Sequence, residues 1–343
     1  MKKKLIAAGI AVISAMLPLK AIAASFTEMY IFGDSLSDTG NIFDFTAGNI
    51  PPSPAFFEGR FSNGLIWIDY LAEDLGLNPI TYADVVLNQT LPTEGINFAF
   101  GGATTGDENT VSLTFPTVPD LPALQDQISL FTADFSSAAD ADALYIIWAG
   151  SNDYLPTEGT FEPFTSSTAS INNLSNAITT LANVGAQNIM VVNLPNLGDT
   201  PVALNANQEE PGITNRLNAL SEEHNTALAA EIDDLTLSLA PDINLISFNL
   251  NALFTDVVNN PETFNFTNVT DGCLLVGCAN PDEFLFWDPQ HVTTAAHQLI
   301  ADAALETLDS PSVPEANFKL GILAFGIWGA GKIMTHKKRS IKG

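Results

Sequence analysis

Basic residues are scarce in the body of this 343-residue chain. The sequence holds 12 Lys and Arg against 39 Asp and Glu, a formal net charge of −27 at pH 7. Ten of those basic residues lie in the first 24 or the last 25 positions, so residues 25–318 contain only Arg60 and Arg216 beside all the acidic residues. So negative a surface repels phosphate backbones and anionic head groups, which argues against nucleic-acid binding and against docking of the body on anionic lipid.

The basic residues at the amino terminus precede an apolar run. Residues 1–24 are predicted to be a signal peptide, with a basic start at Met1–Lys4, an apolar stretch at Leu5–Leu19 and an A-x-A cleavage site at Ala21–Ala23. Cleavage after Ala23 or after Ala24 fits equally well. An uncleaved membrane helix is the weaker alternative, because the apolar run is shorter than the roughly 20 residues that a span needs.

Residues 311–343 carry a second apolar run with a basic flank. Val313-Pro314-Glu315 precedes the apolar Leu320–Gly331, and His336–Arg339 follows. This layout resembles the PEP-CTERM sorting signal of Gram-negative bacteria, with Ala316 where a second Pro is usual. The resemblance implies export through the inner membrane, a C-terminal membrane segment, processing by an exosortase-type enzyme, and a final place at the cell surface or outside the cell. A plain C-terminal membrane tail is the alternative.

Cysteine is nearly absent. Cys273 and Cys278 are the only two, and they lie in a loop between Gly272 and Asn280. In an exported protein a disulfide between them is the first expectation, and its short loop makes the stabilisation local. A two-thiolate metal site is the weaker alternative because no His or third Cys is nearby, and no metal or other cofactor is expected.

The body, residues 25–310, is predicted to be one α/β domain. Tyr145–Trp148 and Ile189–Val192 are apolar on both faces, as is typical of buried parallel strands. Strand–helix alternation predicts a mostly five-stranded parallel sheet with helices on both faces and functional loops at the carboxyl ends of its strands. The predicted strands are 28–33, 96–100, 143–149, 188–193 and 243–248, and the predicted helices are 63–75, 121–133, 166–184, 213–239 and 293–308.

One serine stands where such a sheet places its functional loops. The strand 28–33 ends at Gly33, and Asp34-Ser35-Leu36 follows at once, so Ser35 is expected at the mouth of the sheet with a helix just beyond it. An ordinary helix cap is the alternative for Ser35. A serine nucleophile normally needs a histidine base.

Of the four histidines, His291 has the best setting. It follows Asp288 by three residues across a Pro-containing turn, which lets the carboxylate reach the imidazole Nδ1 and fix its tautomer. His224 is expected to be solvated on a polar helix, and His297 to be a packed helix residue. His336 lies in the tail.

Two further strand ends offer hydrogen-bond donors for an oxyanion. The strand at 96–100 runs into Gly101-Gly102, where a backbone N–H can approach a ligand closely, and the strand at 143–149 is followed by Asn152. Each alone is a strand-end turn and weak support. They support a shared site because Gly102 and Asn152 are expected to lie with Ser35, Asp288 and His291 at one edge of a single sheet.

Four of these stretches occur together in a known family. Gly33-Asp34-Ser35-Leu36, Asn97–Gly102, Gly150–Asp153 and Asp288–His291 resemble, in order, the four blocks of the GDSL (SGNH) esterase/lipase family. The resemblance implies a flavodoxin-like three-layer α/β/α sandwich. It also implies Ser35 as nucleophile, His291 as general base, Asp288 as its orienting carboxylate, and an oxyanion hole from Ser35, Gly102 and Asn152, with Gly101 as the alternative if the register slips by one.

The expected activity is therefore hydrolysis of small-molecule or lipid carboxylic esters through an acyl-enzyme. The family usually has Pro after the His, where this chain has Val292, and no catalytic group is lost by that change. G-x-S-x-G is missing, so an ordinary α/β-hydrolase elbow is not supported. A carbohydrate O-deacetylase or an acyltransferase on the same site, and a non-catalytic surface or matrix-binding protein, remain the alternatives.

Overall fold

Six parallel strands form the centre of the structure, in the order β2-β3-β1-β4-β5-β6. The computed structural model describes residues 26–135, 139–156 and 159–310, so both predicted terminal signals lie outside the described residues. The chain divides into a unit that ends at Asp309 and a second from Ser310 onward. The strands of the central sheet are β1 (Met29–Gly33), β2 (Ile80–Thr81), β3 (Gly95–Asn97), β4 (Leu144–Trp148), β5 (Asn188–Val192) and β6 (Asn244–Phe248), and the parallel pair β7 (Asn268–Gly272) and β8 (Phe284–Phe286) lies apart from it.

The α/β sandwich follows the prediction, with one strand more than the five expected. The additional strand, β2, has two residues and pairs with the edge of β3, which is too short to leave a periodic pattern. The helices are α1 (Asn41–Phe45), α2 (Trp67–Leu75), α3 (Tyr82–Asn88), α4 (Thr110–Thr114), α5 (Leu124–Asp134), α6 (Ser151–Tyr154), α7 (Thr168–Asn183), α8 (Pro201–Glu209), α9 (Ile213–Ser238), α10 (Leu250–Asn259), α11 (Cys273–Val276) and α12 (Thr294–Asp309), with short 3-10 turns η1 (Leu197–Asp199), η2 (Pro261–Phe264) and η3 (Pro281–Glu283).

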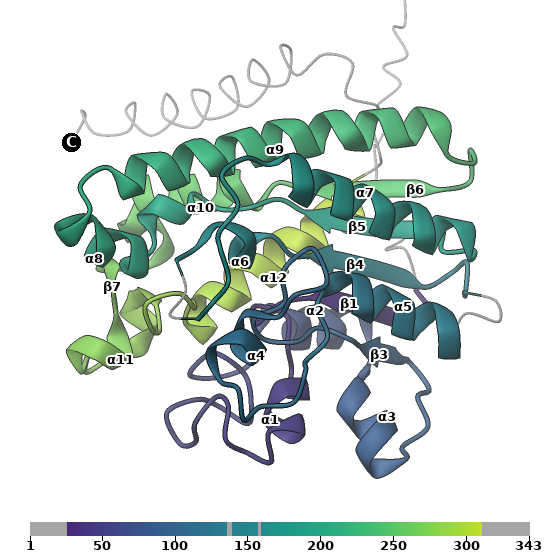
Figure 1. Cartoon of the computed structure of the whole chain (residues 1–343), viewed down its shortest axis with the longest axis horizontal. Helices are drawn as coiled ribbons and strands as arrows, with labels where there is room; N and C mark the ends of the chain where they lie inside the picture. The colour runs from purple at the N-terminus through teal and green to yellow at the C-terminus, as the bar shows by residue number, and fades with distance from the viewer. Residues whose placement is uncertain (1–25, 136–138, 157–158, 311–343) are drawn as a thin grey trace, which may run out of the picture. The chain divides into compact units, whose positions relative to one another are not determined.

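Alternating side chains of the buried strands build two apolar layers. In β4, Ile146 and Trp148 pack with α2, α10 and α12, whereas Tyr145 and Ile147 pack with α5, α7 and α9. Figure 1 shows the helix layer α5, α7 and α9 along one face of the sheet. Since burying one large apolar side chain contributes roughly 1.5–3 kcal/mol, the two layers hold the strands in a fixed register.

Several segments between the predicted strands and helices contain short helices. The segment after β5 forms η1 and α8, and residues 259–284 form η2, β7, α11 and η3. The helix predicted at 63–75 begins later, at Trp67, because the Ile66 N–H donates to Asp69 Oδ2 and starts the helix there. In the part of the chain that the structure describes, no helix combines the length and the apolarity that a bilayer crossing requires.

Candidate active site

Ser35 lies on a tight turn at the carboxyl end of β1. The Asp34 carbonyl accepts the N–H groups of Ser37 and Asp38, each at 3.0 Å. Gly33 is required before this turn, since a Cβ there would lie 2.3 Å from the carbonyl oxygen of Trp148 on β4. The helix expected directly after Ser35 is this single turn instead, and α1 begins only at Asn41.

Ser35, His291 and Asp288 form a continuous chain of hydrogen bonds. Ser35 Oγ lies 2.8 Å from His291 Nε2, and His291 Nδ1 lies 2.7 Å from Asp288 Oδ2. The three side chains are nearly buried. Ser35 and His291 are 256 positions apart in the sequence, so only the fold brings them together.

The Asp288 carboxylate is held in place by its own turn. Its Oδ1 accepts the Gln290 N–H at 2.8 Å and the His291 N–H at 2.7 Å. Burial alone would raise the pKa of Asp288, but the charge of His291 and the hydrogen bonds from the imidazole and the two backbone N–H groups outweigh it and lower that pKa. Asp288 is therefore an anion that fixes the ring with its Nε2 lone pair toward Ser35.

The ring of His291 packs against an aromatic side chain. Phe61 lies 4.9 Å from it between ring centroids, and the neighbouring Ser62 Oγ donates to the Val292 carbonyl at 2.9 Å. Cys273 and Cys278 are joined in a disulfide that spans α11. The Leu274 N–H of α11 donates to the carbonyl of Trp287 at 2.8 Å, which ties this segment to the residue before Asp288.

The glycine pair after β3 differs between its two members. The Gly101 N–H donates to Asp38 Oδ2 at 2.9 Å. Among the hydrogen bonds of the described residues none uses the Gly102 N–H, and Gly102 has a φ of +79° that suits glycine. Of the two glycines, Gly102 is therefore the one whose backbone N–H is available to an oxyanion.

Asn152 reaches the same region from α6. It lines the pocket together with Asp34, Ser35 and His291, and one of its two amide N–H donors goes to the Ala103 carbonyl at 3.0 Å. The next residue, Asp153, is fully buried and accepts the N–H and the hydroxyl of Thr105 at 2.9 and 2.7 Å. These contacts fix α6 against the loop that follows Gly102.

Two buried polar residues that position Ser35 were not predicted from the sequence. Gln127 of α5 accepts the Gly33 N–H at 2.8 Å and donates to the Gly33 carbonyl at 2.9 Å. Asp38 ties the nucleophile turn to the glycine pair, since it accepts N–H groups from Gly40, Asn41, Ile42 and Gly101. A signal for Gln127 existed: it occupies the apolar stripe of its helix beside Leu124, Ile128 and Phe131.

The prediction for His224 was wrong. It is completely buried, its Nδ1 lies 2.9 Å from the Tyr154 hydroxyl, and burial lowers its pKa to about 4. It packs under the Asn152 segment, where a Cβ on Gly150 would lie 3.1 Å from its Cε1. His297 is packed inside α12 as predicted, and burial together with the charge of His291 lowers its pKa to about 3.

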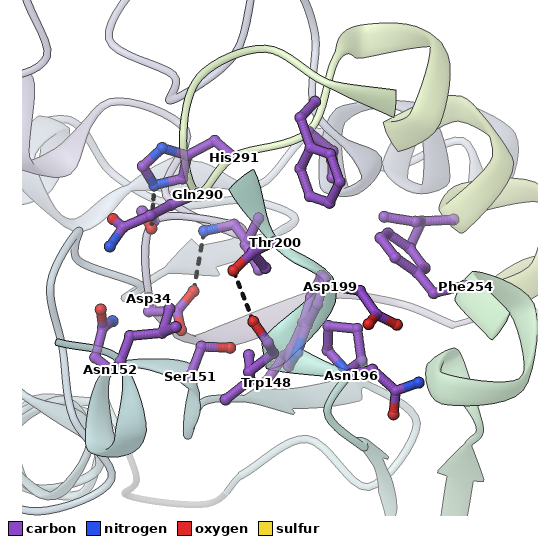
Figure 2. A pocket seen from close by; sticks show the side chains of 18 of the residues that line it. Asp34, Trp148, Ser151, Asn152, Asn196, Asp199, Thr200, Phe254, Gln290 and His291 are labelled. Carbon is purple, nitrogen blue, oxygen red and sulfur yellow. Dashed lines mark hydrogen bonds between the residues drawn. The ribbon is translucent and has the colours of Figure 1, made fainter. Parts of the chain in front are cut away.

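A pocket opens beside Ser35. Figure 2 shows His291, Gln290 and Asn152 at one end of it and Phe254, Asp199 and Asn196 at the other. Within residues 26–135, 139–156 and 159–310 there is no group of three or more potential metal ligands. The hydrogen-bonded serine, histidine and carboxylate suit nucleophilic catalysis at an acyl carbon.

The sequence from residue 29 to 304 matches the GDSL-like Lipase/Acylhydrolase family. The chain belongs to this family. Membership makes it an ester-hydrolysing enzyme in general terms, and the six-stranded parallel sheet flanked by helices is consistent with the SGNH hydrolase fold.

Relatives within this lipase/acylhydrolase family come from bacteria and plants. The chain is 28% identical to the thermolabile hemolysin of Vibrio parahaemolyticus over 82% of this chain and 63% of the hemolysin. It is also 28% identical to the GDSL esterase/lipase At1g29670 of Arabidopsis thaliana, over 79% of this chain and 85% of that protein. A phosphatidylcholine-sterol acyltransferase of Aeromonas hydrophila is 28% identical over 73% of this chain and 66% of the acyltransferase.

Proposed function

We propose that this protein hydrolyses carboxylic esters through an acyl-enzyme on Ser35. The observation that carries the proposal is the unbroken chain from Ser35 Oγ through His291 to Asp288, with bonds of 2.8 and 2.7 Å. In this geometry the imidazole can accept the hydroxyl proton while the carboxylate stabilises the resulting imidazolium.

The first half-reaction forms the acyl-enzyme. Ser35 Oγ bonds to the ester carbonyl carbon, its proton moves to His291 Nε2, and the carbonyl electrons move onto oxygen. The N–H groups of Ser35 and Gly102 and the amide of Asn152 stabilise that oxyanion. When the carbonyl re-forms, the bond to the leaving oxygen breaks, and His291 protonates the departing alcohol.

Water completes the cycle. His291 takes a proton from a water molecule, whose oxygen bonds to the acyl carbon, and the second tetrahedral intermediate collapses to the free acid as the proton returns to Ser35 Oγ. The carboxylate of Asp288 stays ionised throughout, since its pKa is lowered.

Replacing the nucleophile tests the proposal. Ser35→Ala is expected to reduce kcat for p-nitrophenyl acetate by about 10⁴-fold or more and to abolish labelling by a fluorophosphonate. Ser129→Ala, an exposed serine on α5, is the matched control and keeps both. A folded Ser35→Ala variant with near-wild-type turnover contradicts the mechanism.

Acyl transfer is a second candidate, because one relative is named an acyltransferase. The same acyl-enzyme gives an ester when an alcohol replaces water. Adding an alcohol acceptor during turnover and measuring the ratio of new ester to free acid distinguishes transfer from hydrolysis. Acetylated glycans in the same panel test the deacetylase alternative, and failure of the fluorophosphonate to label Ser35 would favour a non-catalytic role.

We further propose that the enzyme is exported and sorted by its two ends. Residues 1–24 have the layout of a signal peptide and residues 311–343 that of a PEP-CTERM signal. The disulfide of Cys273 and Cys278 suits an oxidising compartment. Mass spectrometry of the mature protein tests this, since a chain that keeps Lys337–Gly343 would not have been processed.

A further inference from the structure

The pocket beside Ser35 has two walls of different chemistry. One is carbon-lined and comes from the end of β4, from β8 and from α10 and α12, with Trp148, Phe286, Phe254, Val258 and Ile300. The other comes from the segment after β5 and adds the polar side chains of Asn196, Asp199 and Thr200. The carbon-lined wall continues the main apolar core, in which Trp148, Phe286 and Ile300 are almost inaccessible to solvent.

This wall extends away from Gly102. Gly102 follows β3, whereas the pocket extends past β4 toward the ends of β5 and β6, which lie on the opposite side of β1. Figure 2 shows Phe254 at the end of the pocket remote from Asn152 and His291. A substrate held with its carbonyl oxygen at Gly102 and Asn152 therefore has a chain directed along the wall.

The reaction sequence decides which chain that is. The alcohol must leave, and water must reach the vacated position next to His291 Nε2, before the acyl-enzyme breaks down. A carbon-lined wall offers no hydrogen-bond partner to a departing alcohol or to an incoming water molecule. The acyl chain, by contrast, stays bound through both steps and benefits from burial.

We propose that the wall formed by α10, α12, β4 and β8 binds the acyl chain of esters longer than acetate, and that Val258 on α10 sets the length accepted. This inference rests on the proposed function. Each buried methylene contributes about 0.8 kcal/mol, so kcat/KM is expected to rise about fourfold per methylene until the wall ends.

Val258 is suited to testing the wall because it is only half-buried and packs at the edge of the core. Val258→Trp fills the pocket and is expected to lower kcat/KM for p-nitrophenyl octanoate at least tenfold, with the acetate value within about twofold of wild type. Thr255→Phe, an exposed pocket residue one turn earlier, makes the same test without touching the core. Ala252→Trp, exposed on the same helix outside the pocket, is the control and leaves both values unchanged.

Two results would overturn the assignment. One is a wild-type kcat/KM that stays flat from acetate to octanoate. The other is a Val258→Trp or Thr255→Phe effect confined to acetate esters of longer alcohols, which would place the alcohol on this wall instead.

Binding without turnover separates this inference from the proposed function. In the Ser35→Ala background, methyl octanoate is expected to bind by calorimetry, and addition of Val258→Trp is expected to weaken that binding tenfold or more. If the wild type hydrolyses no ester yet this binding difference is found, the proposed function fails and the acyl wall stands. Equal binding of methyl octanoate to Ser35→Ala with and without Val258→Trp would reject the proposed acyl-binding wall.

Discussion

Asp288→Asn probes the geometry of the triad most directly. The carboxylate accepts three hydrogen bonds, from the backbone N–H groups of Gln290 and His291 and from the imidazole Nδ1. An amide has only one acceptor oxygen. If that oxygen keeps the two backbone bonds, which hold the turn, the amide NH₂ faces Nδ1 and forces the ring proton onto Nε2. His291 can then no longer accept the Ser35 proton.

The expected loss is about 10⁴-fold in kcat, equivalent to about 5–6 kcal/mol of transition-state stabilisation. Steady-state turnover of p-nitrophenyl acetate measures it, with thermal unfolding to show that the variant is folded. Asp282→Asn, which changes an exposed carboxylate on η3, is the matched control and keeps wild-type kcat. A folded Asp288→Asn variant within tenfold of wild type would refute the assignment of the base and its orienting group.

Two further predictions concern the glycine pair and the residue before Ser35. Gly102→Ala would place a Cβ 2.7 Å from Val111 Cγ2 at a φ of +79°, which would misdirect the oxyanion donor, so kcat should fall by about 10²–10³-fold. Gly76→Ala is the control: Gly76 has a φ of +70° and its Cβ would meet nothing within 4 Å, so this variant should lose stability but keep its kcat. Normal kcat in Gly102→Ala would exclude that N–H. Burial raises the pKa of Asp34 to about 7, although the hydrogen bond from the Leu36 N–H and the charge of His291 act to lower it. The protonated Asp34 therefore stabilises the fold fully below about pH 4, and this stabilisation is lost as the pH rises through 7. Asp34→Asn should therefore raise the melting temperature relative to wild type at pH 8 but not at pH 4, and equal shifts at both pH values would contradict this.

Patterns of apolar residues in adjacent sequence predicted the buried strands and the long helices. The runs that became β4 and β5 are apolar on both faces because parallel strands buried between two helix layers have no polar side. The long helices α7 and α9 were found close to their observed bounds, since their apolar stripes and terminal breakers lie in adjacent sequence. Short elements such as β2 and α11 escaped prediction because a few residues establish no period.

The residues of the site were identifiable only as separate strand-end motifs. The position of His224 between Leu220 and Leu228 at helical spacing was a signal of its burial, but its contact with Tyr154 is visible only in the packed structure. The role of Asp38 also depends on the tertiary structure, because its carboxylate accepts N–H groups from the neighbouring Gly40–Ile42 and from the distant Gly101. Burial of this kind depends on which helix face meets the sheet, and that is a property of packing.

By itself, the amino-acid sequence determined the α/β alternation, the acidic body and the residue types available for acyl chemistry, because propensity, charge and periodicity are local. Only the tertiary structure decided that Ser35 Oγ lies 2.8 Å from His291 Nε2, that Gly101 gives its N–H to Asp38 while Gly102 does not, and that α10 lines the pocket. Such distances arise when two apolar layers bring the carboxyl ends of parallel strands to one edge, and a hydrogen bond needs an accuracy of a few tenths of an ångström that only the packed core supplies.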